Sequence, residues 1–196
     1  MKARESGMPE EGSWQGFFDA DCIVGKMDCA RSGTENIVEF GCGYGTFTIP
    51  AARRTSGLIC ALDIEPDLVA RVRQKAAEAR LPNIQAERRD FVTEGSGLGG
   101  RSQDHAMIYN LLHLEDPVGL LREAFRVLRP GGTLSIIHWK VDPATPRGPS
   151  MGIRPRPDQC RAWAESAGFV FVRDQDLSDC CRHHFGLLVA RPRLSP

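Results

Sequence analysis

Short apolar segments alternate with amphipathic ones along most of the chain. Five segments are short and largely apolar, as buried strands are: 36–40, 58–64, 83–91, 104–112 and 133–139. Four segments follow a helical pattern, several of them bounded by proline or glycine: 46–54, 66–81, 117–128 and 158–168. Strands and helices that alternate in this way predict an α/β fold with a parallel sheet and helices on both of its faces.

The last third of the chain departs from this alternation. Residues 140–159 contain five prolines, which predicts an irregular loop, and long ordered loops in compact domains are often functional. Two further apolar segments, 169–174 and 183–191, follow the last helix with no helix between them. We therefore expect them to form an antiparallel pair.

Composition narrows the classes of partner. The chain has 25 Lys and Arg against 25 Asp and Glu, so no basic excess favours nucleic acid or an anionic membrane surface. The N-terminus lacks the apolar core of a signal peptide, and no apolar run approaches the roughly 18 residues of a membrane helix. Seven cysteines show no disulfide or metal spacing. We expect a cytoplasmic protein with reduced thiols, no bound metal, and a monomeric or homodimeric state.

The segment VEFGCGYGTF, residues 38–47, places three glycines behind an apolar strand and ahead of a helix. This arrangement is typical of nucleotide binding, but a dinucleotide fingerprint requires glycine where Thr46 stands. Glu39 would oppose a pyrophosphate, whereas it suits a ligand with an ammonium and a sulfonium group. Asp63 ends the next strand, where a carboxylate accepts the hydroxyls of a ribose.

These features resemble the class I S-adenosylmethionine-dependent methyltransferases, in particular small stand-alone bacterial members of unassigned substrate. Five segments carry the resemblance in order: VEFGCGYGTF, ALDIEPDLV, RRDF, DHAMIYNLLHLEDP and REAFRVLRPGGTLSI. The resemblance implies a doubly wound, Rossmann-like, seven-stranded sheet, mostly parallel with an antiparallel C-terminal hairpin. Its methyltransferase domain would cover residues 36–196, and residues 1–35 would form an N-terminal helical cap.

The resemblance also implies S-adenosylmethionine as the cofactor and assigns contacts to it. Glu39 would reach the amino end of the methionine moiety, Gly41 and Gly43 would let the backbone approach it, and Asn110 and Leu111 would line it. Asp63 would hold the ribose, Ile64 and Phe91 would contact the adenine, and Asp90 would accept from the adenine amine. Ile64 and Phe91 are equally compatible with core positions. Tyr44, on the crest of the loop, would contact donor or acceptor or act as a lid.

Methyl transfer is an in-line displacement, so the protein need only align the acceptor, exclude water and, for a protonated acceptor, remove a proton. His113 and His138 are the leading candidate bases, because both follow strand ends and histidine titrates near neutrality. Either is also compatible with a structural role. Cys180, Cys181, His183 and His184 lie close in sequence but lack metal-ligand spacing.

The acceptor site is predicted from aromatic and basic side chains. Trp14, Phe17 and Phe18 lie on a predicted helix over residues 14–27, and Trp139 ends a strand; core packing is the alternative for these aromatics. Arg147 and Arg154 in the proline-rich loop would attract an anionic acceptor, or else brace the loop. The motifs of DNA, arginine and catechol methyltransferases are absent, so we expect a small-molecule acceptor. The alternative is a non-catalytic module that binds S-adenosylmethionine or S-adenosylhomocysteine.

Overall fold

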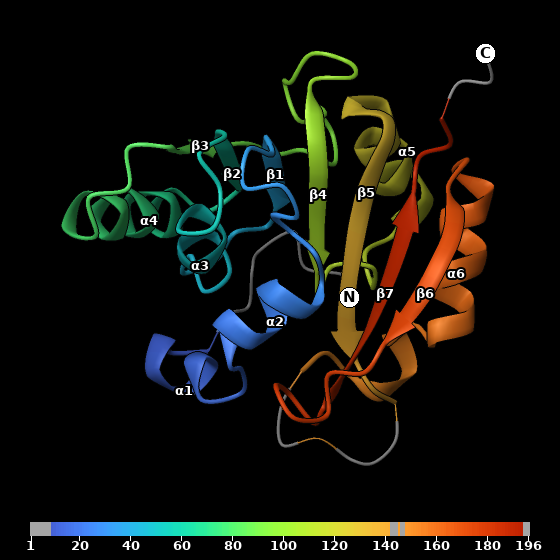
Figure 1. The fold of residues 1–196 in the computed structure, drawn as a ribbon. Coiled ribbons are helices and arrows are strands. Elements are labelled where there is room, and N and C mark those ends of the chain that lie inside the picture. Colours follow the sequence, from blue (N-terminus) through green and yellow to red (C-terminus); the bar gives the residue numbers. More distant parts are fainter. Residues whose placement is uncertain (1–8, 142–144, 146–147, 194–196) are drawn as a thin grey trace.

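The computed structural model describes residues 9–141, 145 and 148–193 of the 196-residue chain. Seven strands form one sheet in the order β3-β2-β1-β4-β5-β7-β6 (Figure 1). The strands are β1 (Ile37–Phe40), β2 (Ile59–Asp63), β3 (Ile84–Arg88), β4 (Gln103–Tyr109), β5 (Leu128–Trp139), β6 (Val170–Gln175) and β7 (His184–Ala190). The helices are α1 (Glu11–Gln15), α2 (Ala20–Lys26), α3 (Thr48–Ala52), α4 (Pro66–Glu78), α5 (Pro117–Val127) and α6 (Pro157–Ser166), with a 3-10 turn at Met151–Ile153.

The sheet confirms the predicted topology. Strands β1 to β5 pair in parallel, whereas β7 runs antiparallel to both β5 and β6. The chain first builds the sheet outward from β1 through β2 to β3, and then returns to place β4 on the other side of β1. The carboxyl ends of β1 and β4 therefore form the switch point at which such sheets bind ligands.

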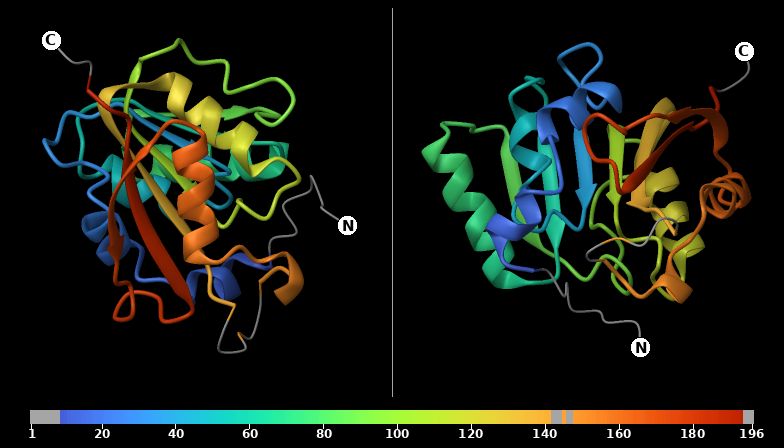
Figure 2. Two further views of the ribbon diagram at one scale, coloured as in Figure 1. Left: turned by 90° about the vertical axis from the view of Figure 1, so that its right-hand side faces the viewer. Right: turned by 90° about the horizontal axis from the view of Figure 1, so that it is seen from below.

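Helices cover both faces of the sheet, and the alternation of strand side chains determines which residues meet them (Figure 2). Val38 and Phe40 of β1 pack in the cluster that includes α5 and α6. Ile37, on the same strand, packs on the opposite face in the cluster that includes α2 and α3. Both faces of β1 are thus covered, which explains why all four of its residues are buried, Glu39 included.

Two predicted elements differ from the structure by more than a shift of a few residues at an end. The helix expected over residues 14–27 is split into α1 and α2, because Asp19 caps α2 by accepting a hydrogen bond from the backbone N–H of Cys22 at 3.0 Å. The strand expected from residue 133 begins at Leu128, directly after α5. Leu128 pairs with Gln103 and Thr133 with His105, so the extra residues between them form an irregularity in the ladder.

The N-terminal segment is attached to the glycine loop and to α4. The carboxylate of Glu11 forms ion pairs with Arg71, at 3.0 Å, and with Lys75. The hydroxyl of Tyr44 donates to the carbonyl of Pro9 at 3.0 Å. These contacts hold α1 near the lower edge of the sheet in Figure 1, toward which β4 and β5 point.

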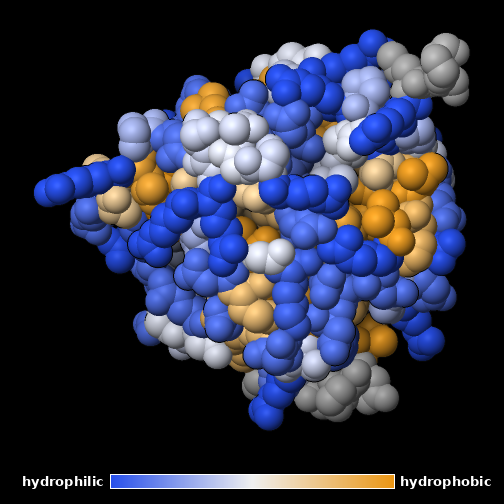
Figure 3. Space-filling model, in the orientation of Figure 1, coloured by the Kyte–Doolittle hydropathy of each residue, from blue (hydrophilic) through white to orange (hydrophobic). Residues whose placement is uncertain are grey.

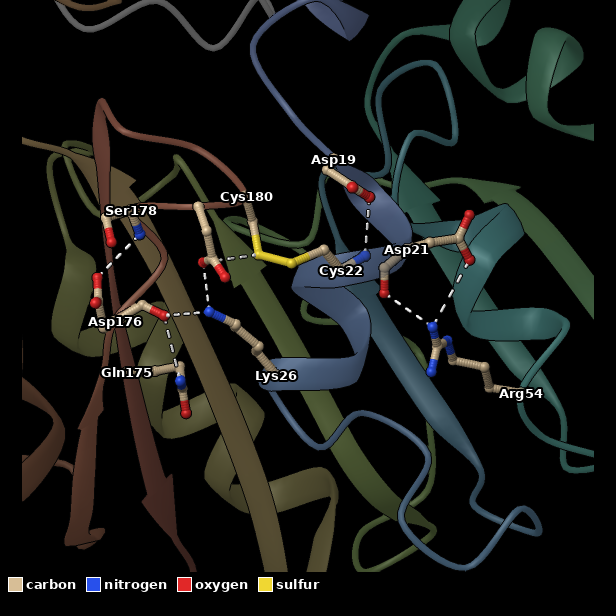
Figure 4. The surroundings of a disulfide bond; sticks show 10 residues. Asp19, Asp21, Cys22, Lys26, Arg54, Gln175, Asp176, Ser178 and Cys180 are labelled. Carbon is tan, nitrogen blue, oxygen red and sulfur yellow. Dashed lines mark hydrogen bonds and ion pairs between the residues drawn. A yellow bond between two sulfur atoms is a disulfide. The ribbon is translucent and has the colours of Figure 1, made fainter.

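A disulfide bond corrects the expectation of reduced thiols. Cys22, in the first turn of α2, is bonded to Cys180, in the segment before β7, and their Cα atoms are 5.8 Å apart (Figure 4). The backbone N–H of Asp19 donates to the carbonyl of Cys180 at 2.9 Å, and Lys26 forms an ion pair with Asp179 beside the bond. The two cysteines are 158 residues apart, so only the fold brings them together and their spacing gave no signal.

The face shown in Figure 3 is mostly hydrophilic, with apolar side chains gathered over the edge formed by β6 and α6. Val170 and Val172 of β6 are exposed there. Arg161 of α6 lies over the ring of the neighbouring Phe171, at 4.0 Å from its centroid. Within the described residues, no helix has the length and apolar character that a bilayer span requires.

Candidate functional site

A cavity of about 300 Å³ opens at the carboxyl ends of β1, β2 and β4, at the switch point of the sheet. Its volume lies at the lower end of the range for small-ligand sites. The cavity is lined by Trp14, Gly41, Cys42, Gly43, Thr46, Phe47, Asp63, Ile64, Arg89, Asp90, Phe91, Val92, Tyr109, Asn110, Leu111, His113, Leu114, Glu115 and Asp116. Most of the predicted cofactor residues are therefore brought together.

The glycine loop is held open by its backbone conformation and its neighbours. Gly41 has a φ of +74°, and a Cβ at this position would lie 2.8 Å from Cδ1 of Leu111. Any larger residue would be strained and would push Leu111 toward the cavity that both residues line. Glycine at position 41 therefore keeps the backbone of the loop accessible to a ligand.

Asp63 organises this loop as well as lining the cavity. One carboxylate oxygen accepts the backbone N–H of Gly43 at 2.8 Å, and the other accepts the backbone N–H of Glu65 at 3.1 Å. The side chain is buried, and burial raises its pKa although both backbone hydrogen bonds act to lower it. A ribose that binds Asp63 would share a carboxylate that already fixes the position of the loop.

Glu39 lies beneath the loop rather than in the cavity wall. It is 2% exposed, and the hydroxyl of Thr48 in α3 donates a hydrogen bond to its carboxylate. Burial raises the pKa of Glu39 to about 8, with a smaller contribution from the nearby charge of Asp63. Its contact with the amino end of a donor remains a prediction, and water or a shift of the loop would be needed to make it.

Two polar side chains of the cavity have buried atoms without a hydrogen-bond partner among the described residues. They are the hydroxyl of Thr46 and both amide atoms of Asn110. Asn110 also has a positive φ of 59°, an uncommon conformation for a residue other than glycine. Unsatisfied buried polar atoms are costly, so a ligand that supplies both donors and acceptors fits here. The ammonium and carboxylate of S-adenosylmethionine have this character.

The adenine-side residues provide an apolar wall with one acid beside it. Phe91 packs edge-on against Phe40, with ring centroids 5.4 Å apart, so it belongs to the core and to the cavity at once. Ile64 also lines the cavity. Asp90 accepts the backbone N–H of Thr93 at 3.2 Å, which holds its carboxylate next to this wall. The residues present therefore fit an adenosine group.

The two candidate bases form a pair, although only His113 lines the cavity. Nδ1 of His113 lies 3.2 Å from Nε2 of His138. His138 is fully buried, and burial lowers its pKa to about 3, so its ring is neutral near pH 7. His184 is also buried, between Trp139 and Phe18, whereas His183 contacts Phe17.

Among the predicted acceptor residues, the structure places Trp14 in the cavity wall and the other aromatics behind it. Phe17 packs edge-on against the buried Trp139 at 5.3 Å, and Phe18 packs against Phe47 at 5.2 Å. Through these contacts the N-terminal segment packs against the rest of the protein. The hydroxyl of Tyr44 is engaged by the N-terminal segment, and Tyr44 is not among the lining residues.

Arg154 is engaged within its own loop. Its guanidinium donates to the carbonyls of Pro149 and Lys140 at 2.8 and 2.9 Å, and to the hydroxyl of Thr145 at 2.7 Å. It also lies over the ring of Trp139. This arrangement favours bracing of the loop over capture of an anionic acceptor. Arg147 lies outside the described residues.

Nine cavity residues had no functional role in the sequence prediction: Cys42, Thr46, Phe47, Arg89, Val92, Tyr109, Leu114, Glu115 and Asp116. Tyr109 ends a buried hydrogen-bond chain in which its hydroxyl lies 2.9 Å from that of Ser135, which in turn lies 2.9 Å from Nε2 of His105. Thr46, Arg89, Tyr109 and Glu115 lie inside the segments that carry the resemblance, but the resemblance assigned no contact to them.

Potential metal ligands gather at one place in the described part of the chain, formed by Cys22, Asp179 and Cys180. The two sulfur atoms are bonded to each other there, so they are not available as thiolate ligands. Cys42 lines the cavity, but burial raises the pKa of its thiol well above the usual value. It is therefore poorly suited to act as a nucleophile.

Comparison with known proteins agrees with this site. Residues 37–132 match a family model described as a methyltransferase domain. Aklanonic acid methyltransferase DauC from Streptomyces sp. (strain C5) is 33% identical over 104 residues, which cover 52% of this chain and 46% of that protein. Ubiquinone biosynthesis O-methyltransferase from Xanthomonas oryzae pv. oryzae is 28% identical over 130 residues, covering 63% and 50%. The matches thus span half or less of these curated relatives.

The whole fold also has a solved counterpart. A structure described as a SAM-dependent methyltransferase from Aquifex aeolicus superimposes with a TM-score of 0.79 at 20% identity. The superposition covers 93% of this chain and 94% of the other. At this identity, the likeness concerns the fold.

The fold is a Rossmann-like α/β fold with a cavity at its switch point. The match of residues 37–132 to a methyltransferase domain and the similarity to methyltransferases support a narrower class. That class is the S-adenosylmethionine-dependent methyltransferases of class I.

Proposed function

We propose that this protein binds S-adenosylmethionine in the cavity at the switch point and catalyses transfer of its methyl group to a hydroxyl-bearing small molecule. The observation that carries the proposal is the set of groups converging on one cavity: the glycine loop, Asp63, and the unsatisfied atoms of Thr46 and Asn110. The match of residues 37–132 to a methyltransferase domain supports the same chemistry. The oxygen acceptor is inferred from the relative named as an O-methyltransferase.

Each group has a role in this proposal. The cofactor supplies a methyl group already activated by its sulfonium. The residues of the chain bind and orient: Asp63 takes the ribose hydroxyls, while Asn110 and Thr46 take the polar end of the methionine moiety. Trp14 closes the cavity from the N-terminal side and limits the access of water. The neutral charge balance of the chain favours a small acceptor over nucleic acid.

Calorimetry tests the cofactor. S-adenosylmethionine and S-adenosylhomocysteine should bind with micromolar dissociation constants, corresponding to about −8 kcal/mol, and NAD should not bind. Formation of S-adenosylhomocysteine in the presence of a panel of hydroxylated aromatics tests the reaction. NAD binding without binding of either sulfur ligand would refute the cofactor assignment. Cofactor binding without turnover of any acceptor would instead identify a non-catalytic binding module.

A further inference from the structure

We propose that His113 is the general base of the reaction and that His138 is a positioning residue, which holds His113 with its proton on Nδ1 and its basic lone pair on Nε2. This inference rests on the proposed function and assigns different roles to the two histidines. It follows from which ring nitrogens can donate and which must accept.

The tautomer of His138 is set by its surroundings. Its Nδ1 lies 3.4 Å from the carbonyl oxygen of Trp139, and a carbonyl can only accept a hydrogen bond. The ring is fully buried and neutral, so it carries a single N–H. That hydrogen is therefore on Nδ1, and Nε2 of His138 is left as an acceptor.

The tautomer of His113 then follows. Nε2 of His138 needs a donor, and Nδ1 of His113 lies 3.2 Å away. In the neutral ring of His113 the proton must then be on Nδ1, and Nε2 is the basic nitrogen. His113 lines the cavity, whereas His138 does not, so the fully buried histidine determines which nitrogen of the half-buried one is basic.

The cavity that His113 lines contains more acidic than basic side chains. Glu115 and Asp116 follow His113 in the same turn and line the same cavity, as does Asp90 from the segment after β3. Arg89 is the opposing charge on that wall.

The proton transfer balances without a further reactant. The acceptor O–H bond breaks and an N–H bond forms at Nε2 of His113. The oxygen keeps the electron pair with which it takes the methyl group, and the imidazolium later releases its proton to water. The acceptor therefore carries a hydroxyl acidic enough to exchange its proton with imidazole, as phenols and enols do.

Nitrogen NMR of histidine side chains tests the positioning role without any cofactor. In ligand-free protein at pH 8, we expect His113 to show a protonated Nδ1 and an unprotonated Nε2. His138→Gln keeps an acceptor oxygen and should retain this tautomer, whereas His138→Phe removes the acceptor and should lose it. The ring of His105, bonded to the hydroxyls of Thr133 and Ser135, is the internal reference. A proton on Nε2 in the wild type, or an unchanged tautomer in His138→Phe, would overturn the inference.

A matched pair of probes tests the base. In the complex with S-adenosylhomocysteine, phenol should shift the Nε2 resonance of His113, and anisole, which lacks the proton, should not. Equal responses to both probes, or none, would remove His113 as the base. Failure of S-adenosylhomocysteine to bind would instead refute the proposed function, while the tautomer measured in free protein would stand.

Discussion

Reduction of the disulfide between Cys22 and Cys180 should destabilise the protein strongly without weakening cofactor binding. The bond joins residues 158 positions apart, so it constrains most of the unfolded chain. The chain-entropy model gives roughly 5 kcal/mol for a loop of this size, and measured values for disulfides are typically about 2–4 kcal/mol. The folded state should change little, because Ile23 and Val24 are buried in the core and hold α2 in place without the bond.

Urea unfolding checks this magnitude. With a slope of about 2 kcal/mol/M, a loss of about 4 kcal/mol moves the midpoint down by roughly 2 M when dithiothreitol is added. Alkylation and mass spectrometry should count five reactive cysteines in the unfolded protein without reductant and seven with it. Cys22→Ser and Cys180→Ser should both unfold at the reduced midpoint and be insensitive to dithiothreitol.

Two results would contradict this reasoning. Equal midpoints for protein shown to be oxidised and reduced would mean that the bond does not act through the unfolded chain. A reduced protein with the same midpoint but at least tenfold weaker binding of S-adenosylhomocysteine would mean that the bond instead controls the position of the N-terminal segment.

Three further predictions concern buried ionisable groups. Asp63→Ala should weaken S-adenosylhomocysteine binding at least tenfold by calorimetry, about 1.4 kcal/mol, and unchanged affinity would refute its role. Glu39 keeps its proton in the folded state up to about pH 8 but loses it near 4.5 when unfolded, so stability falls as pH rises through this window. Glu39→Gln should remove that loss of stability. An equal change in the urea midpoint of variant and wild type between pH 5 and 8 would contradict this prediction. Three buried histidines have pKa values lowered by burial to about 4, 3 and 2: His105, His138 and His184. Only the unfolded chain binds protons at these sites just below pH 6.5. The three histidines together should therefore lower the free energy of unfolding by about 3 kcal/mol between pH 6.5 and 5.5. Protonation of Glu39 in the folded state should offset about 1.4 kcal/mol of this loss. A Glu39→Gln variant lacks this offset, and a flat profile of its urea midpoints over the same interval would refute the prediction.

Local patterns were sufficient to predict the sheet, because each strand carries its signal within a few residues. The glycine loop after β1 and the acid at the end of β2 depend only on their position along the chain, so the sequence alone assigns Gly41 and Asp63 to one site. The antiparallel pair of β6 and β7 followed from the lack of a helix between them.

Contacts between distant segments could not be predicted in this way. The positions of His113 and His138 differ because only His113 lines the cavity, and this depends on packing around β5 rather than on spacing. Arg154 looked like an anion-binding residue in sequence, but the carbonyls of its own loop occupy its donors. The sequence did not single out Thr46 as a binding residue, because only the fold shows that its hydroxyl is buried without a hydrogen-bond partner among the described residues.

The long covalent link has a consequence for synthesis on the ribosome. Cys22 is translated 158 residues before its partner, which at about 5–20 residues per second leaves its thiol waiting roughly 10 to 30 s. Cys29, Cys42, Cys60 and Cys160 are translated during this interval, and each is a wrong partner that Cys22 can meet. All four are buried in the folded protein, so folding withdraws these competitors from exchange.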